Sequence, residues 1–271
     1  MNISLSPEIL FHIGSFAVSN ALLWSFFISA VLMVIALIFG SRLKEVPGRV
    51  QGLIEIIVGG AFDFVRSIIG SDRKARRIFP LVFSMFVFTL ISNLFTYIPG
   101  QSALSVRGAE GTVPLFRAVM SDYGQVFMMT ILTVVLVQIV TIVVHGPFGY
   151  LGKFINLKGI FKFFAALFRG QFRPGDFFQG FLDLFLGLMD IVGELAKIFS
   201  LSFRLFGNIF AGEVLTAVIL FLAPFFVPLP FMFLGLLTAV VQAFVFSILT
   251  LIFVTMASEI EEDQLAEQST M

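Results

Sequence analysis

The sequence predicts an all-α, polytopic integral membrane protein with about five membrane helices. Of its 271 residues, 58% are hydrophobic and only 13% are charged, whereas a soluble domain carries roughly 25% charged residues. So little charge cannot cover a water-soluble surface of this size, which excludes a soluble enzyme and a disordered chain. The formal net charge is zero, so no global field attracts a polyanion and no nucleic acid partner is expected. The absence of cysteine excludes disulfides and thiol chemistry.

Five apolar stretches are expected to form a single membrane domain over residues 1–271. Each meets the requirement of about 20 mostly apolar residues for a spanning helix. In chain order they cover residues 18–40, 78–98, 123–144, 177–222 and 229–256. The second and third form a helical hairpin, with Asp122 as the N-cap of the third. The last two are joined by a proline-rich turn and form a long tilted helix pair, because the fourth is too long for a perpendicular crossing.

Residues 48–70 are predicted to form an amphipathic helix in the membrane interface. The segment is apolar but carries Arg49, and Glu55, Asp63 and Arg66 recur at helical spacing. The alternative is that this segment forms a sixth span.

The distribution of Lys and Arg predicts the topology. Loop 41–77 carries eight of these residues and loop 145–176 carries five, but loop 99–122 carries only two. The first two loops are therefore expected in the cytoplasm and the third outside. This places the N-terminus outside and the C-terminus in the cytoplasm. Since no basic residue precedes Arg42 and no cleavage site is evident, no signal peptide is expected.

The fourth apolar stretch contains an unusual series of charges. Its six members are Asp183, Asp190, Glu194, Lys197, Arg204 and Glu213. Asp183, Asp190, Lys197 and Arg204 recur every seven residues, and seven residues rotate a helix to roughly 20° short of two full turns. These four therefore share one face, which Asn208 continues one turn later. Glu213 points to the opposite side, about 13 Å further along the axis.

These charges indicate an ion pathway with a barrier in its middle. An isolated charge at the centre of a span costs roughly 2.5–3.5 kcal/mol, so deep charges such as Arg204 and Glu213 require a role. Arg204 stays charged and provides a fixed counter-charge, whereas Glu213 can load and release a proton. Gln242 in the last span lies near the depth of Arg204 or Asn208. There it can bond the guanidinium, hold water, or make an ordinary interhelical hydrogen bond.

The charges nearer the helix start leave alternatives open. Asp183 and Asp190 fit a position at the membrane interface as well as a place on the pathway. Lys197 can snorkel, or it can pair with Glu194 three residues earlier.

Several stretches resemble subunit a of the F-type ATP synthase of bacteria. The most specific is LSFRLFGNIFAGE at 201–213, followed in the last helix by LTAVVQAFVFSILTLIFVTMA at 237–257. VPGRVQGLIE at 46–55 and SNLFTYIPG at 92–100 resemble further segments of the family in the same order. The resemblance covers nearly the whole chain.

The resemblance implies a non-catalytic, ion-translocating stator subunit in a bacterial plasma (inner) membrane. Its Arg204 would face the carboxylates of a rotating ring of c subunits, between two aqueous half-channels that carry protons or sodium ions. Asn208, Glu213 and Gln242 match positions of the external path and the arginine surroundings. Candidates for the cytoplasmic path are Asp190, Glu194 and Lys197. The implied partners are the c ring, the peripheral stalk b subunits, the rest of the synthase and the lipid bilayer.

Two positions depart from the family pattern. Gly235 stands where some members carry a His paired with the Glu, and Thr96 stands where some carry an Asp. No Gly-rich phosphate loop and no paired-His motif occurs in the sequence, so no cofactor, nucleotide or metal is expected. The alternative function is a secondary transporter or channel with its own intramembrane substrate site, which predicts internal repeats and broken helices. A structural scaffold would not need six charges in one helix.

Overall fold

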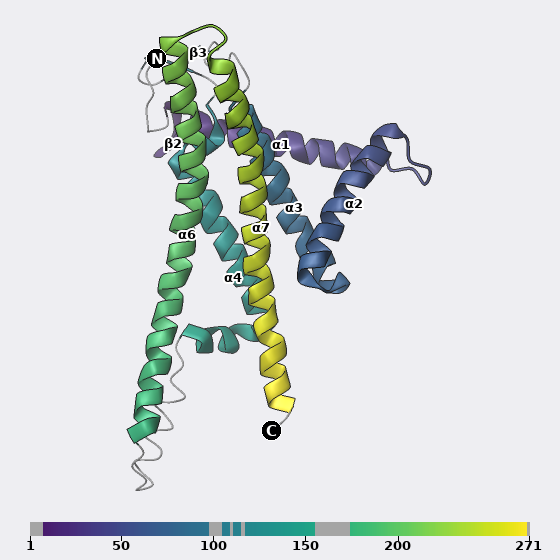
Figure 1. The fold of residues 1–271 in the computed structure, drawn as a ribbon, viewed down its shortest axis with the longest axis vertical. Coiled ribbons are helices and arrows are strands. Elements are labelled where there is room, and N and C mark those ends of the chain that lie inside the picture. The colour runs from purple at the N-terminus through teal and green to yellow at the C-terminus, as the bar shows by residue number, and fades with distance from the viewer. Residues whose placement is uncertain (1–7, 98–104, 109–110, 115–116, 155–173, 270–271) are drawn as a thin grey trace. The chain divides into compact units, whose positions relative to one another are not determined.

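The computed structural model describes residues 8–97, 105–108, 111–114, 117–154 and 174–269. These residues form six α-helices, one short 3₁₀ helix and two small β-hairpins (Figure 1). Five of the helices are long and apolar enough to cross a membrane, which confirms the predicted polytopic all-α fold class. The chain folds into two compact units, one of residues 1–129 and 202–251 and the other of residues 130–201 and 252–271.

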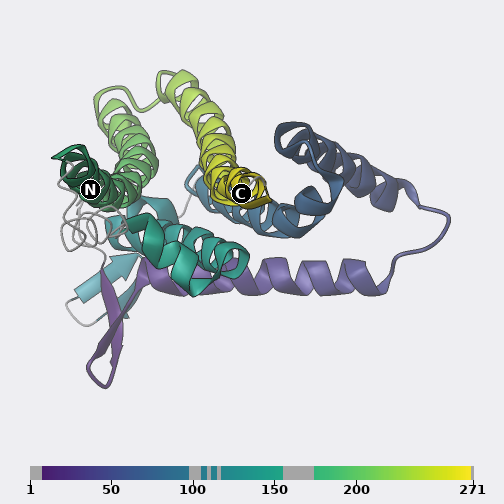
Figure 2. The same cartoon turned by 90° about the horizontal axis from the view of Figure 1, so that it is seen from below.

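The first unit begins with a β-hairpin that leads directly into a helix. Strands β1 (Ile9–Ile13) and β2 (Phe16–Ser19) pair antiparallel. Gly14 supplies the positive φ of 64° that their tight turn requires. Ser19 then caps α1 (Asn20–Ser41), because its Oγ accepts the backbone N–H of Leu22 at 3.2 Å. Figure 2 shows the hairpin at one end of α1 and the loop to the next helix at the other.

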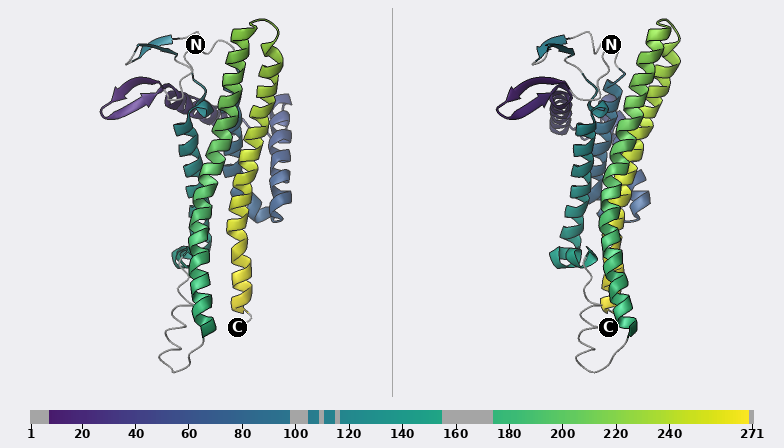
Figure 3. Two further views of the ribbon diagram at one scale, coloured as in Figure 1. Left: turned by 60° about the vertical axis from the view of Figure 1, so that its left-hand side comes forward. Right: turned by 90° about the vertical axis from the view of Figure 1, so that its left-hand side faces the viewer.

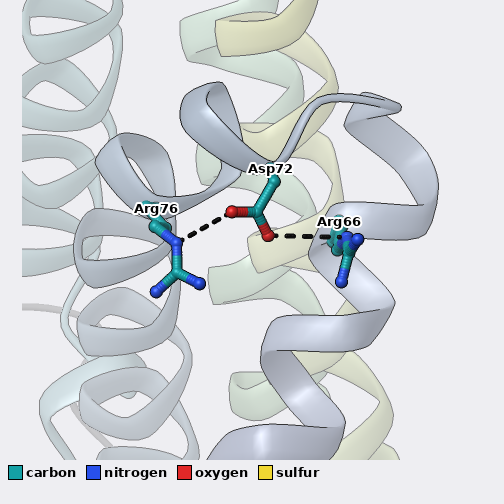
Figure 4. Close-up of polar contacts among 3 residues, drawn as sticks. All are labelled: Arg66, Asp72 and Arg76. Atoms are coloured by element: carbon teal, nitrogen blue, oxygen red, sulfur yellow. Dashed lines mark hydrogen bonds and ion pairs between the residues drawn. The ribbon is translucent and has the colours of Figure 1, made fainter.

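Helices α2 (Arg49–Ile69) and α3 (Asp72–Phe95) meet at a sharp corner in the same unit. Gly70 ends α2 in the left-handed conformation, with φ of 73°, and its N–H donates to the carbonyl of Arg66. The carboxylate of Asp72 lies 2.9 Å from Nε of Arg76 and 3.5 Å from Nε of Arg66, so it bridges the two helices (Figure 4). All three side chains are largely exposed, so the bridge adds little stability.

Helix α2 corresponds to the predicted amphipathic helix at 48–70. It is not among the five helices apolar enough to span a membrane, which disfavours the alternative of a sixth span. It packs on α3 through the edge-to-face pair of Phe62 and Phe79, with the guanidinium of Arg76 over the Phe62 ring. Its other side carries exposed apolar residues, among them Val50, Leu53, Ile56 and Ile57.

A second hairpin and a short helix follow α3 in the chain. Strands β3 (Ser105–Gly108) and β4 (Gly111–Pro114) pair antiparallel, and the 3₁₀ helix η2 (Val119–Ser121) comes next. Helix α4 (Tyr123–Phe154) then begins at the residue that follows Asp122. The carboxylate of Asp122 accepts the N–H of Gly124 at 2.9 Å, which confirms the predicted N-cap.

The two C-terminal helices are each continuous. Helix α6 (Pro174–Leu222) and α7 (Pro228–Ser269) are joined by the short turn 223–227, as the prolines predict. Pro228 begins α7 and Pro230 lies in its first turn, where a missing N–H costs no helical hydrogen bond. Within the first unit, residues 228–251 of α7 run back beside residues 202–222 of α6 (Figure 3). The whole segment between α4 and α6, residues 155–173, lies outside the described residues.

Candidate functional site

Arg204 lies on an uncovered face of α6. Ser202, Leu205 and Ile209 on the other side of the helix are buried in the first unit. The exposed face repeats at intervals of four and three residues, as one side of a helix should. It consists of Arg204, Asn208, Ala211, Leu215, Val218 and Leu222. The guanidinium has no ion pair and no hydrogen bond with any residue that the structure describes, so it is available to a group from outside the chain.

Asn208 and Gln242 join α6 to α7 next to Arg204. Nδ2 of Asn208 donates to Oε1 of Gln242 over 2.9 Å, and the two residues lie equally far from the turn between the helices. The Gln242 side chain is 4% exposed, whereas Asn208 is exposed on the same face as Arg204. The sequence left open whether Gln242 bonds the guanidinium, water or another helix. The structure shows an interhelical amide pair.

Glu213 is half-buried and belongs to a different side of α6 from Arg204. Its carboxyl group has the Ser121 side chain as a hydrogen-bond partner, and the charge of Arg117 acts on it. Ser121 is fully buried at the end of η2, and its hydroxyl donates to the carbonyl of Ala118 over 3.0 Å. A hydroxyl has one proton and two lone pairs. Ser121 therefore still has lone pairs that can accept a hydrogen bond from a protonated Glu213.

Asp122 follows Ser121 and lies just outside the third span. Its side chain is buried and accepts backbone N–H groups of Gly124 and Gln125. Burial raises the pKa of Asp122, and these hydrogen bonds and the charge of Arg117 oppose the rise only in part. Through Asp122, the first turn of α4 thus holds the neighbouring residue Ser121 in its place beside Glu213.

The end of α3 supplies polar groups that the sequence analysis did not assign to the site. Nδ2 of Asn93 donates to the carbonyl of Ala239 in α7 over 3.1 Å. Four buried side-chain oxygens nearby have no hydrogen-bond partner among the described residues. They belong to Ser92, Asn93, Thr96 and Tyr97. Their spacing of one and four residues along a helix end is the signal that could have identified a polar face here.

The second unit contains the three candidates for the cytoplasmic path. Nζ of Lys197 lies 3.0 Å from Oε1 of Glu194 and 4.9 Å from the centre of the Phe253 ring. The alternative that Lys197 pairs with Glu194 is therefore the arrangement in the structure. Asp190, one helical turn before Glu194, is exposed. The arrangement leaves Asp190 as the accessible carboxylate of the three.

The structure thus brings Asn208 together with Gln242, and Glu194 together with Lys197, but it keeps Glu213 away from Arg204. In the described parts of the chain no three His, Cys, Asp or Glu residues gather as metal ligands would. The site has a fixed positive charge, Arg204, on an exposed helix face. It also has a half-buried carboxyl group, Glu213, with Ser121 as its hydrogen-bond partner. The fold and site define a polytopic α-helical membrane protein with charged side chains inside one of its long apolar helices.

Comparison with known proteins identifies the family. The model of the family described as ATP synthase A chain matches residues 22–255, so the chain belongs to this family. ATP synthase subunit a of Geobacter sulfurreducens is 31% identical over 247 residues, which cover 90% of this chain and 89% of that protein. The subunit a of Geotalea daltonii is 29% identical over 236 residues, or 87% of this chain and 86% of that protein. The resemblance seen in the motifs is confirmed, and the chain is an integral membrane protein.

Proposed function

We propose that this chain is the ion-translocating stator subunit of a rotary F-type ATP synthase. The observation that carries the proposal is Arg204, which is exposed within the apolar part of α6 and has no ion pair among the described residues. An arginine facing lipid at the centre of a span costs roughly 2.5–3.5 kcal/mol even on insertion scales. A partner that covers this face and brings a carboxylate removes that cost. The carboxylates of a ring of c subunits, passing one at a time, fit this requirement.

Arg204 would work by favouring the ionised state of each passing carboxylate. Opposite charges roughly 4 Å apart attract by about 4 kcal/mol at an effective dielectric of about 20. This attraction expels the bound ion, yet it is weak enough for thermal motion and the ion gradient to move the carboxylate onward. The same fixed charge repels a cation that would cross directly between the half-channels. Arg204 therefore both drives unloading and prevents a leak.

Two half-channels, one from each side of the membrane, would end on opposite sides of Arg204. The external half-channel uses Glu213, with Asn208 and Gln242 between it and the arginine. The cytoplasmic half-channel uses Asp190, Glu194 and Lys197, of which Asp190 has the most accessible carboxylate. The coupling ion is a proton or a sodium ion.

The arrangement in the membrane follows from helix length and loop charge. Helix α6 has 49 residues, which corresponds to about 74 Å, more than twice the roughly 30 Å of hydrocarbon. We propose that it lies strongly tilted with α7 against the curved c ring, and that the whole chain serves as one membrane domain. The N-terminus is external and the C-terminus cytoplasmic in a bacterial plasma (inner) membrane. The further partners are the peripheral stalk b subunits and the remainder of the synthase.

Site-specific photocrosslinking in the assembled complex tests the proposal. A benzophenone side chain replaces Leu215, which lies on the exposed face of Arg204, or Phe26, which is exposed on α1. The Leu215 probe should crosslink to a small ring subunit, whereas the Phe26 probe should not. Co-purification of the soluble ATPase with the chain is expected in both cases. A Leu215 probe that labels only lipid, or a chain that purifies alone as a transporter would, contradicts the proposal.

A further inference from the structure

Tyr97 fills a notch that two glycines leave between α6 and α7. It follows the end of α3, and its N–H donates to the carbonyl of Leu94 over 3.1 Å. A Cβ built on Gly212 would lie 2.8 Å from Oη of Tyr97. A Cβ on Gly235 would lie 2.5 Å from Cε1 and 2.6 Å from Oη. Since real Cβ contacts essentially never fall below 3.0 Å, both helices need glycine for the ring to occupy this place.

The hydroxyl at the end of this ring is buried and has no partner among the described residues. Leaving a buried hydroxyl without a hydrogen bond costs about 1–3 kcal/mol, and native structures contain few such groups. The ring itself could be accommodated as Phe, which would avoid this cost. A Tyr in this position therefore indicates a use for the oxygen.

Glu213 is an ionisable group near this hydroxyl. Gly212 is the immediate neighbour of Glu213 in α6, and a Cβ on Gly212 would lie 2.8 Å from Oη of Tyr97. The charge of Glu213 acts electrostatically on Tyr97. Ser121 is the other hydroxyl at Glu213, and it is a hydrogen-bond partner of the carboxyl group. The hydroxyls of Tyr97 and Ser121, from two separate segments of the chain, are thus both associated with the carboxyl group of Glu213.

Building on the proposed function, we propose that Tyr97 is a positioning residue of the external half-channel. Its hydroxyl, through a bridging water molecule, holds the carboxyl group of Glu213 as an ion passes. A phenol can donate to the carboxylate when Glu213 is ionised and can accept from the carboxyl group when Glu213 is protonated. Together with Ser121 it gives Glu213 a partner in both states, without losing its own proton.

The test compares Tyr97→Phe with the matched change Tyr123→Phe in assembled complexes in inverted vesicles. Tyr123 packs its ring on Phe127 and Phe203, and Phe keeps that packing. Tyr97→Phe keeps the ring that fills the notch but removes the hydroxyl. Gradient-driven ATP synthesis should fall about three- to tenfold, as the loss of one ordinary, water-mediated hydrogen bond implies. Its dependence on lumenal pH, the external side, should shift toward higher pH because an ionised Glu213 loses a donor.

A second background separates a positioning role from a structural one. In Glu213→Gln complexes, Tyr97→Phe should produce no further pH shift, because the group on which it acts no longer titrates. A shift that persists there, or a Tyr97→Phe complex that matches Tyr123→Phe in rate and pH profile, overturns the inference. Arg204→Ala is measured in parallel. If it abolishes synthesis while Tyr97→Phe has no effect, the inference fails and the proposed function stands; if it leaves synthesis intact, the proposed function fails.

Discussion

Glu213 places a titratable carboxyl group within the apolar helix α6, with Ser121 as its hydrogen-bond partner. Glu213→Gln removes the proton that can be loaded but keeps the shape of the side chain. We expect gradient-driven ATP synthesis to fall at least about a hundredfold, because a positioned acid–base group typically contributes that factor or more. Assembly should persist, because Gln can still use Ser121 as a hydrogen-bond partner. The measurement is ATP synthesis at several external pH values in vesicles with equal amounts of complex.

The matched control for this change is Glu45→Gln. Glu45 is exposed in the loop between α1 and α2 and loses the same charge. It should synthesise ATP like the parent. Equal rates for Glu213→Gln and Glu45→Gln at every pH would remove Glu213 from the pathway.

The contact between Gly212 and Tyr97 gives a geometric prediction at the same scale. Gly212→Ala places a Cβ 2.8 Å from Oη, and no other atom of the surroundings is as close. The variant should therefore lower the amount of assembled complex, whereas the double variant Gly212→Ala with Tyr97→Phe should restore it because the obstructing oxygen is gone. Quantitative immunoblotting of purified complex measures both. A double variant no better than Gly212→Ala alone would show that the close approach is not what Gly212 is needed for.

At this scale the sequence identified the residues whose chemistry is unusual for their place. A charge such as Arg204 in an apolar helix is conspicuous in the sequence alone, and helical spacing separates it from Glu213. Tyr97 and Ser121 could not be identified in this way, because each lies in a segment distant in sequence from Glu213. The notch for Tyr97 depends on Gly212 in α6 and Gly235 in α7. The residue pattern of either helix alone does not show that a side chain from a third segment fills this notch.

The start of α4 gives a prediction at the scale of one element. Asp122→Ala removes the acceptor of the Gly124 N–H and should lower the free energy of unfolding by about 1 kcal/mol. Asp122→Asn keeps an acceptor and should lose less. Burial raises the pKa of Asp122, so the folded state holds this proton more tightly than the unfolded state does. Its contribution is fully present below the ordinary value of 3.8 and is lost as the pH rises through the folded pKa.

Thermal unfolding of the purified chain in detergent, followed by circular dichroism, checks both parts. The parent should lose stability relative to Asp122→Asn as the pH rises from below 3.8. A difference between the two proteins that does not vary with pH would refute the assigned pKa direction. An Ala variant as stable as the Asn variant would refute the cap.

The elements themselves were predictable where length and hydropathy suffice. The apolar run 18–40 corresponds to α1, and the run 229–256 corresponds to the first two-thirds of α7. The β1–β2 hairpin was missed although Gly14 and Ser15 between two apolar runs are a typical hairpin signal. Residues 18 and 19 were assigned to the first span, which concealed the second strand. The α2–α3 corner depends on Gly70 in the left-handed conformation, which hydropathy does not report.

Loop charge predicts the orientation of the whole molecule, and this prediction can be tested cleanly because the chain contains no cysteine. Ser105→Cys lies in the loop 99–122 and should react with a membrane-impermeant maleimide in right-side-out spheroplasts. Arg73→Cys lies at the start of α3 and should react in inverted vesicles instead. The opposite pattern would reverse the assignment of the two half-channels, and Glu213 would then serve the cytoplasmic side.

In the proposed function, the single fixed charge of Arg204 on an exposed helix face both drives the rotor and blocks a leak. Ion flux and ATP synthesis are measured in vesicles that carry assembled Arg204→Ala complexes, with Arg42→Ala as the control because Arg42 is exposed in a loop. Arg204→Ala should stop gradient-driven synthesis and raise passive ion leak through the membrane sector, whereas Arg42→Ala should do neither. Synthesis by Arg204→Ala near the parent rate would contradict the account.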